Sequence, residues 1–350
     1  MTPRDLLVDL VSTPSVSGGE AEAAGVLVDY FEARGRDAWT DEVGNVRAPG
    51  DDGVLLTSHI DTVPGHIDVR VGNGELWGRG SVDATGPLAA MAAASVETGA
   101  SFVGVVEEET TSKGARHLAA DRAEPEAVVN GEPSGWDAVT LGYRGYLVGT
   151  YTAETASGHS SRPDPNAVQH ATAWTERVQA AFGAEPGEEP TTEAATDGET
   201  SVFESVTVKP VSFDGGLADD GQSVQATVDV QFRLPPGTTA DDVRETVASC
   251  TTHGDVSWGD SIPPVMSSPR TPVAGALRAG IRDAGGDPTH LRKTGTSDAN
   301  VYADAWDCPV ATYGPGDSSL DHAPDERIDL AAFDRGVDVL TTAADRLCTS

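Results

Sequence analysis

The chain has 350 residues, enough for two domains and a substantial buried core. It carries 56 acidic residues against 23 basic ones, a formal net charge of −33, and the acids are spread along the whole chain rather than gathered in a tail. This pattern excludes the basic stripe that nucleic-acid binding requires. It favours a protein adapted to high salt, in which the repulsion between like charges is screened, over one whose acids serve cation binding.

No segment is typical of a membrane anchor or of a disulfide framework. The most apolar stretch, Leu88 to Val96, is far shorter than the roughly 20 residues that a bilayer requires. The three cysteines Cys250, Cys308 and Cys348 lie far apart and lack CxxC spacing. Such thiols are typical of a reducing cytoplasm, so we expect a cytoplasmic protein.

The first part of the chain alternates between helical segments and short apolar strands. Thr2, Pro3 and Asp5 predict the start of a helix, since they suit its cap, its first position and its first turn. Strands are predicted at three short apolar runs, Val54–Thr57, Phe102–Val106 and Ala127–Val129. This alternation indicates an α/β fold with a mostly parallel sheet and helices on both of its faces.

Metal-capable side chains follow each of these three strands. They are His59 after the first strand, Glu107 to Glu109 after the second, and Glu132 after the third. In open α/β sheets the functional site forms outside the carboxyl ends of the strands. We therefore expect these side chains to converge at one edge of the sheet.

After about Gly142 the pattern changes to that of a ferredoxin-like unit. Half-exposed strands are predicted at two alternating segments, Tyr146–Thr155 and Ser223–Leu234. Helices are predicted at Asn166–Phe182 and Thr239–Cys250, and an acidic loop at Gly183–Thr200. The order strand, helix, strand, strand, helix, strand is typical of a ferredoxin-like fold.

From about Pro269 the first pattern returns, with a helix predicted near Val273–Ala284 and a strand at Val310–Tyr313. We therefore predict a catalytic domain in two parts, residues 1–142 and 266–350. The ferredoxin-like domain is inserted between them at residues 143–265, as a lid or dimerisation domain.

Each candidate site motif has a structural alternative when taken alone. His59 and Asp61 project from one side of a strand end, as a metal ligand and its carboxylate partner would, or as a satisfied histidine beside a turn aspartate. Asp83 in GRGSVDATG is either a ligand or a helix cap. The glycines of this segment lack the spacing of a phosphate-binding loop.

The remaining acids and the second histidine also allow two interpretations. The three acids Glu107–Glu109 repel one another unless a cation or proton intervenes, or else they form a solvated turn. His322 in DHAPDE is a ligand or a surface histidine. Two imidazoles with several carboxylates and no cysteine are a set that suits zinc or cobalt.

Taken in order, these motifs resemble one enzyme family over essentially the whole chain. The segments HIDTVP, GRGSVDATG, EEET, GEPS, GHSSRP, GTSDANVYA and DHAPDE are similar to those of the zinc-dependent deacylases and exopeptidases. That family includes acetylornithine deacetylase, succinyl-diaminopimelate desuccinylase, aminoacylase and carboxypeptidase G. KTGTSDANVYA and GSVDATGPLAAM look most like the hydrolases that release lysine or ornithine from the carrier protein LysW.

The resemblance implies a cofactor of two zinc ions, for which cobalt can substitute. One ion would be held by His59, Asp83 and Glu132, and the other by Asp83, Glu109 and His322, so that Asp83 bridges them. Thr85 stands where many relatives have lysine, a departure that affects a local charge pairing and not the zinc ligands.

The resemblance also implies three catalytic roles. Asp61 would orient His59, and Glu108 would be the general base that serves the attacking water. His159 would come from the partner subunit of a homodimer and steady the oxyanion. Glu107 is assigned no metal.

The expected function is hydrolysis of a LysW-linked amide in lysine or arginine biosynthesis. The alternatives are the same chemistry on a free N-acyl amino acid, such as acetylornithine or succinyl-diaminopimelate, and a catalytically inactive binding protein of the same fold. LysW is itself acidic, so this partner requires salt screening or a local basic patch. Three residues are open candidates for substrate contacts or for structural roles: Arg144, Arg233 and Asp298.

Overall fold

The computed structural model describes residues 1–183 and 202–348, which form two compact units. The first unit comprises Met1–Gly142, Met266–Arg292 and Ser297–Ser350, and the second comprises Tyr143–Val265 and Lys293–Thr296. Most of the acidic loop predicted at Gly183–Thr200 lies outside the described residues.

A mixed sheet of nine strands forms the centre of the first unit. Its four central strands are mutually parallel, and they lie in the order β6 (Ala100–Val105), β3 (Asp51–His59), β7 (Val128–Gly131) and β15 (Val310–Gly314). All four strands predicted for this part of the chain are therefore confirmed. The flanking strands are β1 (Trp39–Thr40) and β2 (Val46–Ala48) beyond β6, and β8 (Gly135–Tyr143), β13 (Val265–Met266) and β14 (Thr289–Lys293) beyond β15. Because β2 and β8 pair antiparallel with their inner neighbours, the sheet is mostly parallel only at its centre.

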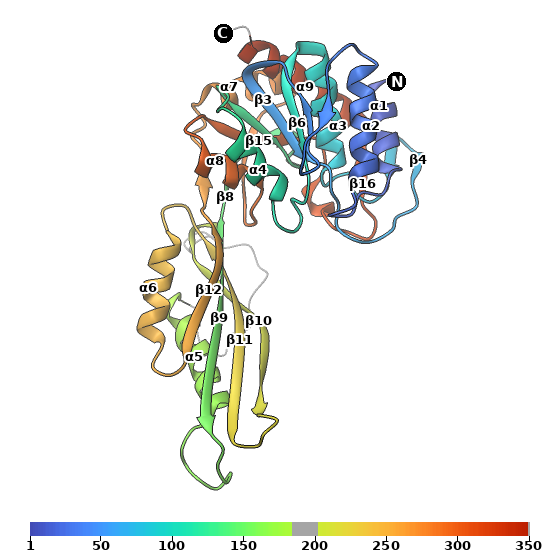
Figure 1. Ribbon diagram of the computed structural model, residues 1–350. Coiled ribbons are helices and arrows are strands. Elements are labelled where there is room, and N and C mark those ends of the chain that lie inside the picture. The colour runs from blue at the N-terminus through green and yellow to red at the C-terminus, as the bar shows by residue number, and fades with distance from the viewer. Residues whose placement is uncertain (184–201, 349–350) are drawn as a thin grey trace. The chain divides into compact units, whose positions relative to one another are not determined.

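Helices cover both faces of this sheet (Figure 1). One face is covered by α3 (Thr85–Thr98) and α9 (Leu330–Cys348), with α1 (Pro3–Val11), α2 (Ala21–Glu32) and α7 (Pro272–Asp283) packed around them. The other face is covered by α8 (Asp298–Ala305) and α4 (Lys113–Asp121). The predicted start of α1 is confirmed, because the Thr2 side chain accepts a hydrogen bond from the Asp5 backbone and Pro3 occupies the first turn.

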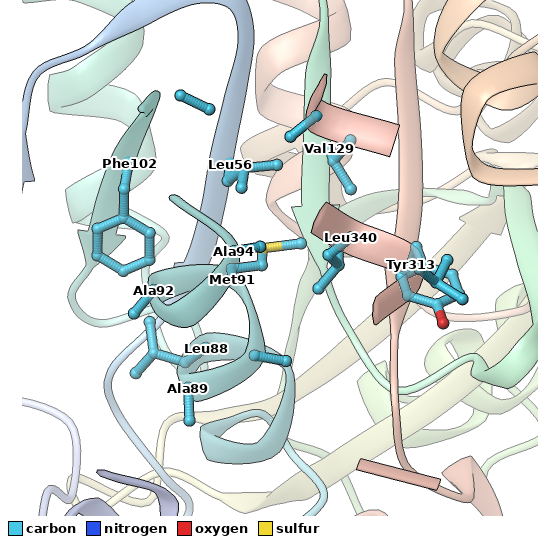
Figure 2. Close-up of a cluster of buried hydrophobic side chains, with 14 of the residues drawn as sticks. Leu56, Leu88, Ala89, Met91, Ala92, Ala94, Phe102, Val129, Tyr313 and Leu340 are labelled. Atoms are coloured by element: carbon cyan, nitrogen blue, oxygen red, sulfur yellow. The ribbon is translucent and has the colours of Figure 1, made fainter. Parts of the chain in front are cut away.

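The alanine-rich helix α3 is buried on all sides, which explains its lack of a polar face. Its Leu88 and Met91 pack against Leu56 and Phe102 of the sheet and, with Leu340 of α9, belong to the main core (Figure 2). Within the described residues, no helix combines the length and the apolarity needed to cross a bilayer.

A separate three-stranded sheet carries segments that flank the site. It consists of β4 (Arg70–Gly72), β5 (Glu75–Trp77) and β16 (Arg327–Asp329), in the order β16-β5-β4. β16 pairs antiparallel with β5, so the end of β5 lies beside the start of β16. The residues that follow β5 and those that precede β16 therefore leave this sheet at the same end.

The second unit has the predicted order of elements. These are β9 (Gly145–Ala156), α5 (Ala167–Ala181), β10 (Thr207–Leu217), β11 (Ser223–Leu234), α6 (Ala240–Cys250) and β12 (Asp255–Ile262). The strands form an antiparallel sheet in the order β10-β11-β9-β12, the ferredoxin-like arrangement. Asn166 and Thr239 cap the two helices, and Trp174 of α5 stacks on Tyr151 of β9 with ring centroids 4.4 Å apart.

Candidate metal centre

The predicted ligands converge because the sheet is parallel at its centre. His59 is the last residue of β3, Glu132 directly follows β7, Glu109 lies in the turn after β6, and His322 lies in the segment after β15. The carboxyl ends of parallel strands meet at one edge of the sheet, so these four side chains gather there. The fifth, Asp83, lies in the segment that joins β5 to α3.

The five side chains form two groups that share Asp83. In the first group, His59 Nε2 lies 3.3 Å from Asp83 Oδ1 and 3.9 Å from Glu132 Oε1. In the second, His322 Nε2 lies 3.2 Å from Asp83 Oδ2 and 3.1 Å from Glu109 Oε1. Each oxygen of Asp83 therefore faces a different histidine, as a bridging carboxylate requires.

The residues present fit a pair of divalent ions. Within each group the ligand atoms lie within 4.8 Å of one another. Zinc bonds of about 2 Å place tetrahedral ligands roughly 3.3 Å apart, which is close to the shorter of these separations. Imidazole nitrogens and carboxylate oxygens, without cysteine, are donors for zinc and similar ions.

Asp61 supports the site in two ways. The nearest partner of His59 Nδ1 is the backbone carbonyl oxygen of Asp61, at 2.9 Å, whereas the Asp61 carboxylate lies 3.6 Å away. That carboxylate accepts hydrogen bonds from Ser17 Oγ at 2.7 Å and from the backbone N–H groups of Glu108 and Glu109 at 3.0 and 3.1 Å. The sequence predicts only a contact with His59, whereas the structure adds the hydrogen bonds to the glutamate turn.

The electrostatics of the site favour the binding of positive charge. The hydrogen bond that His322 donates to the Asp83 carboxylate raises the pKa of His322 to about 9. Burial alone would lower the pKa of His59, but the nearby carboxylates of Asp61 and Asp83 raise it well above the usual value. Burial and the charge of Glu132 raise the pKa of Glu108 well above its usual range. Without a metal, these acidic side chains can lie so close together only if protons neutralise part of their charge. Bound divalent ions would neutralise the charge instead.

We expect the stability of the metal-free protein to depend on pH through His322. Its pKa rises from 6.5 to about 9 on folding, so the contribution of its protonated form is complete below pH 6.5 and is lost as the pH rises through 9. Thermal unfolding of chelator-treated protein should therefore show a decreasing Tm over this range. His322→Gln should flatten the dependence, and an equal slope in that variant would contradict this origin.

The other residues singled out in the sequence occupy varied positions. Glu107 has a φ of 57° and pairs with Lys113 Nζ at 2.8 Å, so its carboxylate is engaged outside the two ligand groups. Asp83 is not a helix cap, since α3 is capped by Ala84 without a side-chain hydrogen bond. Asp298 is only 2% exposed, and burial raises its pKa to about 7, so its carboxylate is shielded from a substrate side chain.

Three further candidates belong to the second unit. His159 is exposed in the turn between β9 and α5, where its Nδ1 lies 2.8 Å from Ser161 Oγ. Arg144 is buried and donates hydrogen bonds to the backbone carbonyls of Thr294 and Val202, and burial lowers its pKa to about 10. Arg233 lies over the Tyr146 ring, 4.6 Å from its centroid.

Two supporting residues were not found from the sequence. Ser17 binds Asp61, and Glu326, which stands in the DHAPDE motif, binds the loop that carries Asp83. The DHAPDE motif does not by itself indicate the role of Glu326, because its partners include backbone N–H groups more than 240 residues away in the chain.

Comparison with known proteins decides the family. Residues 55–346 match Peptidase family M20/M25/M40. The chain belongs to this family. It is accordingly a metal-dependent hydrolase that acts on amide bonds, with the two ligand groups as its candidate metal centre.

Relatives of known name extend over the full chain. A LysW-lysine hydrolase of Deinococcus radiodurans is 41% identical and is aligned over 98% of this chain and 96% of its own length. A LysW-lysine/LysW-ornithine hydrolase of Sulfurisphaera tokodaii is 28% identical, over 99% and 95%. Among solved structures of the M20 fold, a metallo-carboxypeptidase of Sulfolobus solfataricus matches with a TM-score of 0.78 at 17% identity, covering 99% of both chains. A dinuclear metal binding peptidase of Bacillus subtilis matches with a TM-score of 0.71 at 13% identity, over 98% and 96%.

Proposed function

We propose that this protein is a two-zinc amidohydrolase that releases lysine or ornithine from the carrier protein LysW, in the cytoplasm, as a step of amino-acid biosynthesis. The observation that carries the proposal is the pair of ligand groups that share Asp83, with Glu108 beside them. The substrate is supported by the relatives named as LysW-lysine and LysW-ornithine hydrolases. Zinc is the proposed metal because the donor set suits it, and cobalt is the proposed substitute.

The catalytic roles follow from the chemistry of the side chains. When bound, the two ions supply Lewis acidity, which polarises the amide carbonyl and lowers the pKa of water toward 7. Glu108 takes a proton from the attacking water and delivers it to the leaving amine. Asp61 fixes Glu108 through its backbone N–H, so the base is held in place before the substrate binds.

We propose that the protein acts as a homodimer. In the described part of the second unit, β10 is an edge strand, and its Val211, Phe213 and Leu217 are 47–64% exposed. An exposed apolar edge strand of this length is a hazard for aggregation unless another chain covers it. Pairing with β10 of a second copy would cover it in the antiparallel manner of the rest of this sheet.

His159 is proposed to donate a hydrogen bond to the oxyanion formed in a partner subunit. His159→Ala should lower turnover by about 100- to 1000-fold, the usual cost of removing such a donor, without changing the metal content. Mixing inactive His159→Ala with inactive Glu108→Gln should restore activity in mixed dimers, because one of their sites then has both residues intact. Lack of restored activity in mixed dimers verified by mass would exclude action across subunits.

Substrate recognition by a second-unit arginine is part of the proposal. Arg233 is half-buried, stacks on Tyr146 and donates one hydrogen bond to Thr296 Oγ1 at 3.3 Å. A planar guanidinium held in this way suits a carboxylate, such as that of a γ-glutamyl group. Arg144 is the less suitable candidate, since its guanidinium is occupied by backbone carbonyls.

The function is tested by comparing substrates in high salt. Purified protein is stripped with a chelator, reloaded with Zn²⁺ or Co²⁺, and assayed with LysW-lysine, LysW-ornithine and acetylornithine. Metal-dependent release from the two carrier substrates is expected. A preference for acetylornithine would favour the free acyl amino acid alternative, and absence of turnover with every metal and substrate would favour an inactive binding protein.

The charge of the chain predicts a salt effect that depends on the substrate. LysW is acidic and this chain carries a net charge of −33, so their encounter is repulsive at low salt. Raising KCl from about 0.1 to 1 M shortens the Debye length from about 10 to 3 Å and should raise kcat/KM for LysW-lysine severalfold. Acetylornithine carries one negative and one positive group and so no net charge, and its kcat/KM should change less. Parallel salt profiles would argue against the carrier as partner.

A further inference from the structure

A buried carboxylate outside the two ligand groups binds the loop that carries the bridging ligand. Glu326 is 0% exposed, and it lies four residues after His322, immediately before β16. Its Oε1 accepts hydrogen bonds from the backbone N–H groups of Val82 at 2.8 Å and Asp83 at 3.1 Å. Its Oε2 accepts from Gly80 N–H at 3.0 Å and from Arg79 Nη1 at 2.8 Å.

All four donors belong to the loop between β5 and α3, which carries Asp83. A fifth hydrogen bond joins the same partners, since the Gly78 N–H donates to the Glu326 backbone carbonyl at 3.3 Å. Each of the two carboxylate oxygens therefore accepts two hydrogen bonds. An amide or a hydroxyl at this position could not accept all of them.

The loop and the first turn of α3 pack closely against their neighbours. Gly80 has a φ of +80°, and a Cβ there would lie 2.5 Å from Thr62 Cγ2. A Cβ at Gly86, at the start of α3, would lie 2.6 Å from Ile328 Cδ1 on β16. The start of α3 therefore packs directly against β16, and the Glu326 carboxylate joins the Asp83 loop to the segment that precedes β16.

We infer that Glu326 is a positioning residue of the metal centre, which locks the Asp83 loop to the His322 segment so that both ligands face the same ion. Asp83 and His322 come from segments more than 230 residues apart, and their facing atoms must stay within about 3 Å of each other. Glu326 accepts a hydrogen bond from the backbone of Asp83, and it lies only four residues after His322 in the chain. The inference rests on the proposed metal centre and adds a residue that sets its geometry.

The variant Glu326→Gln tests this inference, because it keeps the shape of the side chain and replaces one acceptor oxygen with an NH₂ group. That NH₂ group faces two N–H donors wherever it is placed, so half of the hydrogen bonds are lost. Partners that orient metal ligands typically contribute about 10- to 100-fold to metal affinity. We expect the dissociation constant for Zn²⁺, measured by chelator competition on folded protein, to rise by about this factor. The visible spectrum of the Co²⁺-loaded protein should change as well.

Glu75→Gln provides the matched control. Glu75 lies on β5, the strand paired with β16, and its carboxylate binds Arg327 at 3.2 Å without touching the Asp83 loop. This variant removes the charge of a carboxylate that accepts a hydrogen bond from Arg327, so a general weakening of the small sheet would appear in both variants. Only Glu326→Gln should change the Zn²⁺ affinity and the Co²⁺ spectrum.

A merely structural role predicts a different outcome. In that case Glu326→Gln would lower the Tm of the metal-free protein but leave the Zn²⁺ affinity and Co²⁺ spectrum of its folded fraction unchanged, which would overturn the inference. If Glu326→Gln does not fold, Glu326→Asp decides, since it keeps the charge but shortens the reach. Weakened Zn²⁺ binding by folded Glu326→Asp supports the inference, and unchanged binding overturns it. All of these measurements are made without substrate. A failure of the proposed function would be seen separately, because the unsubstituted protein would then not bind a pair of metal ions.

Discussion

Glu108→Gln should reduce turnover by about 100- to 10,000-fold while the protein still binds two metal ions per chain. The range is the usual contribution of a general base. The amide cannot accept the proton from water, but it is similar in size and leaves the backbone hydrogen bond to Asp61 intact. Measurements of kcat and of metal content by elemental analysis check both parts of this expectation.

Glu107→Gln is the control for this variant. Glu107 is the neighbouring residue and carries the same side chain, but its carboxylate binds Lys113 at the surface. It should retain near-normal turnover. Normal turnover in Glu108→Gln would remove Glu108 as the base, and an equal loss in both variants would point to disruption of the turn rather than to proton transfer.

Asp83→Ala should have the second large effect, since it removes the ligand that both groups share. Its two oxygens face different histidines, at 3.3 and 3.2 Å, so neither group keeps its three ligands. Because bound metal contributes several kcal/mol to such reactions, turnover should fall on the order of 1000-fold or more. His322→Ala, in contrast, should weaken only the second group.

Counting bound Zn²⁺ by titration distinguishes these variants. The expected order is two ions for the unsubstituted chain, one tight ion for His322→Ala, and none bound tightly for Asp83→Ala. Asp68→Ala is the matched control, because the Asp68 side chain is 96% exposed and its partner among the described residues is His66. Two tight ions in Asp83→Ala would show that Asp83 does not bridge.

Local chemistry made much of the fold predictable from the sequence. The alternation in SVQATVDVQFRL predicts β11 with its observed bounds, and Thr2, Asn166 and Thr239 mark helix starts through hydrogen bonds made within a single turn. The parallel order at the centre of the sheet follows from helices that alternate with buried strands. These features depend on residues close in the chain, which is why the sequence reveals them.

The sequence by itself determined which residue types end the strands, and it therefore indicated His59, Glu109 and Glu132 as candidates on one edge of a sheet. Only the tertiary structure decided that His322 and Asp83 face one another, that Asp61 holds the glutamate turn, and that Asp298 is buried away from solvent. Only the tertiary structure also showed that Glu326 binds the backbone of the Asp83 loop. These relations join segments that are tens to hundreds of residues apart, and they are set by packing and by backbone hydrogen bonds, for which a linear pattern of side chains carries no signal.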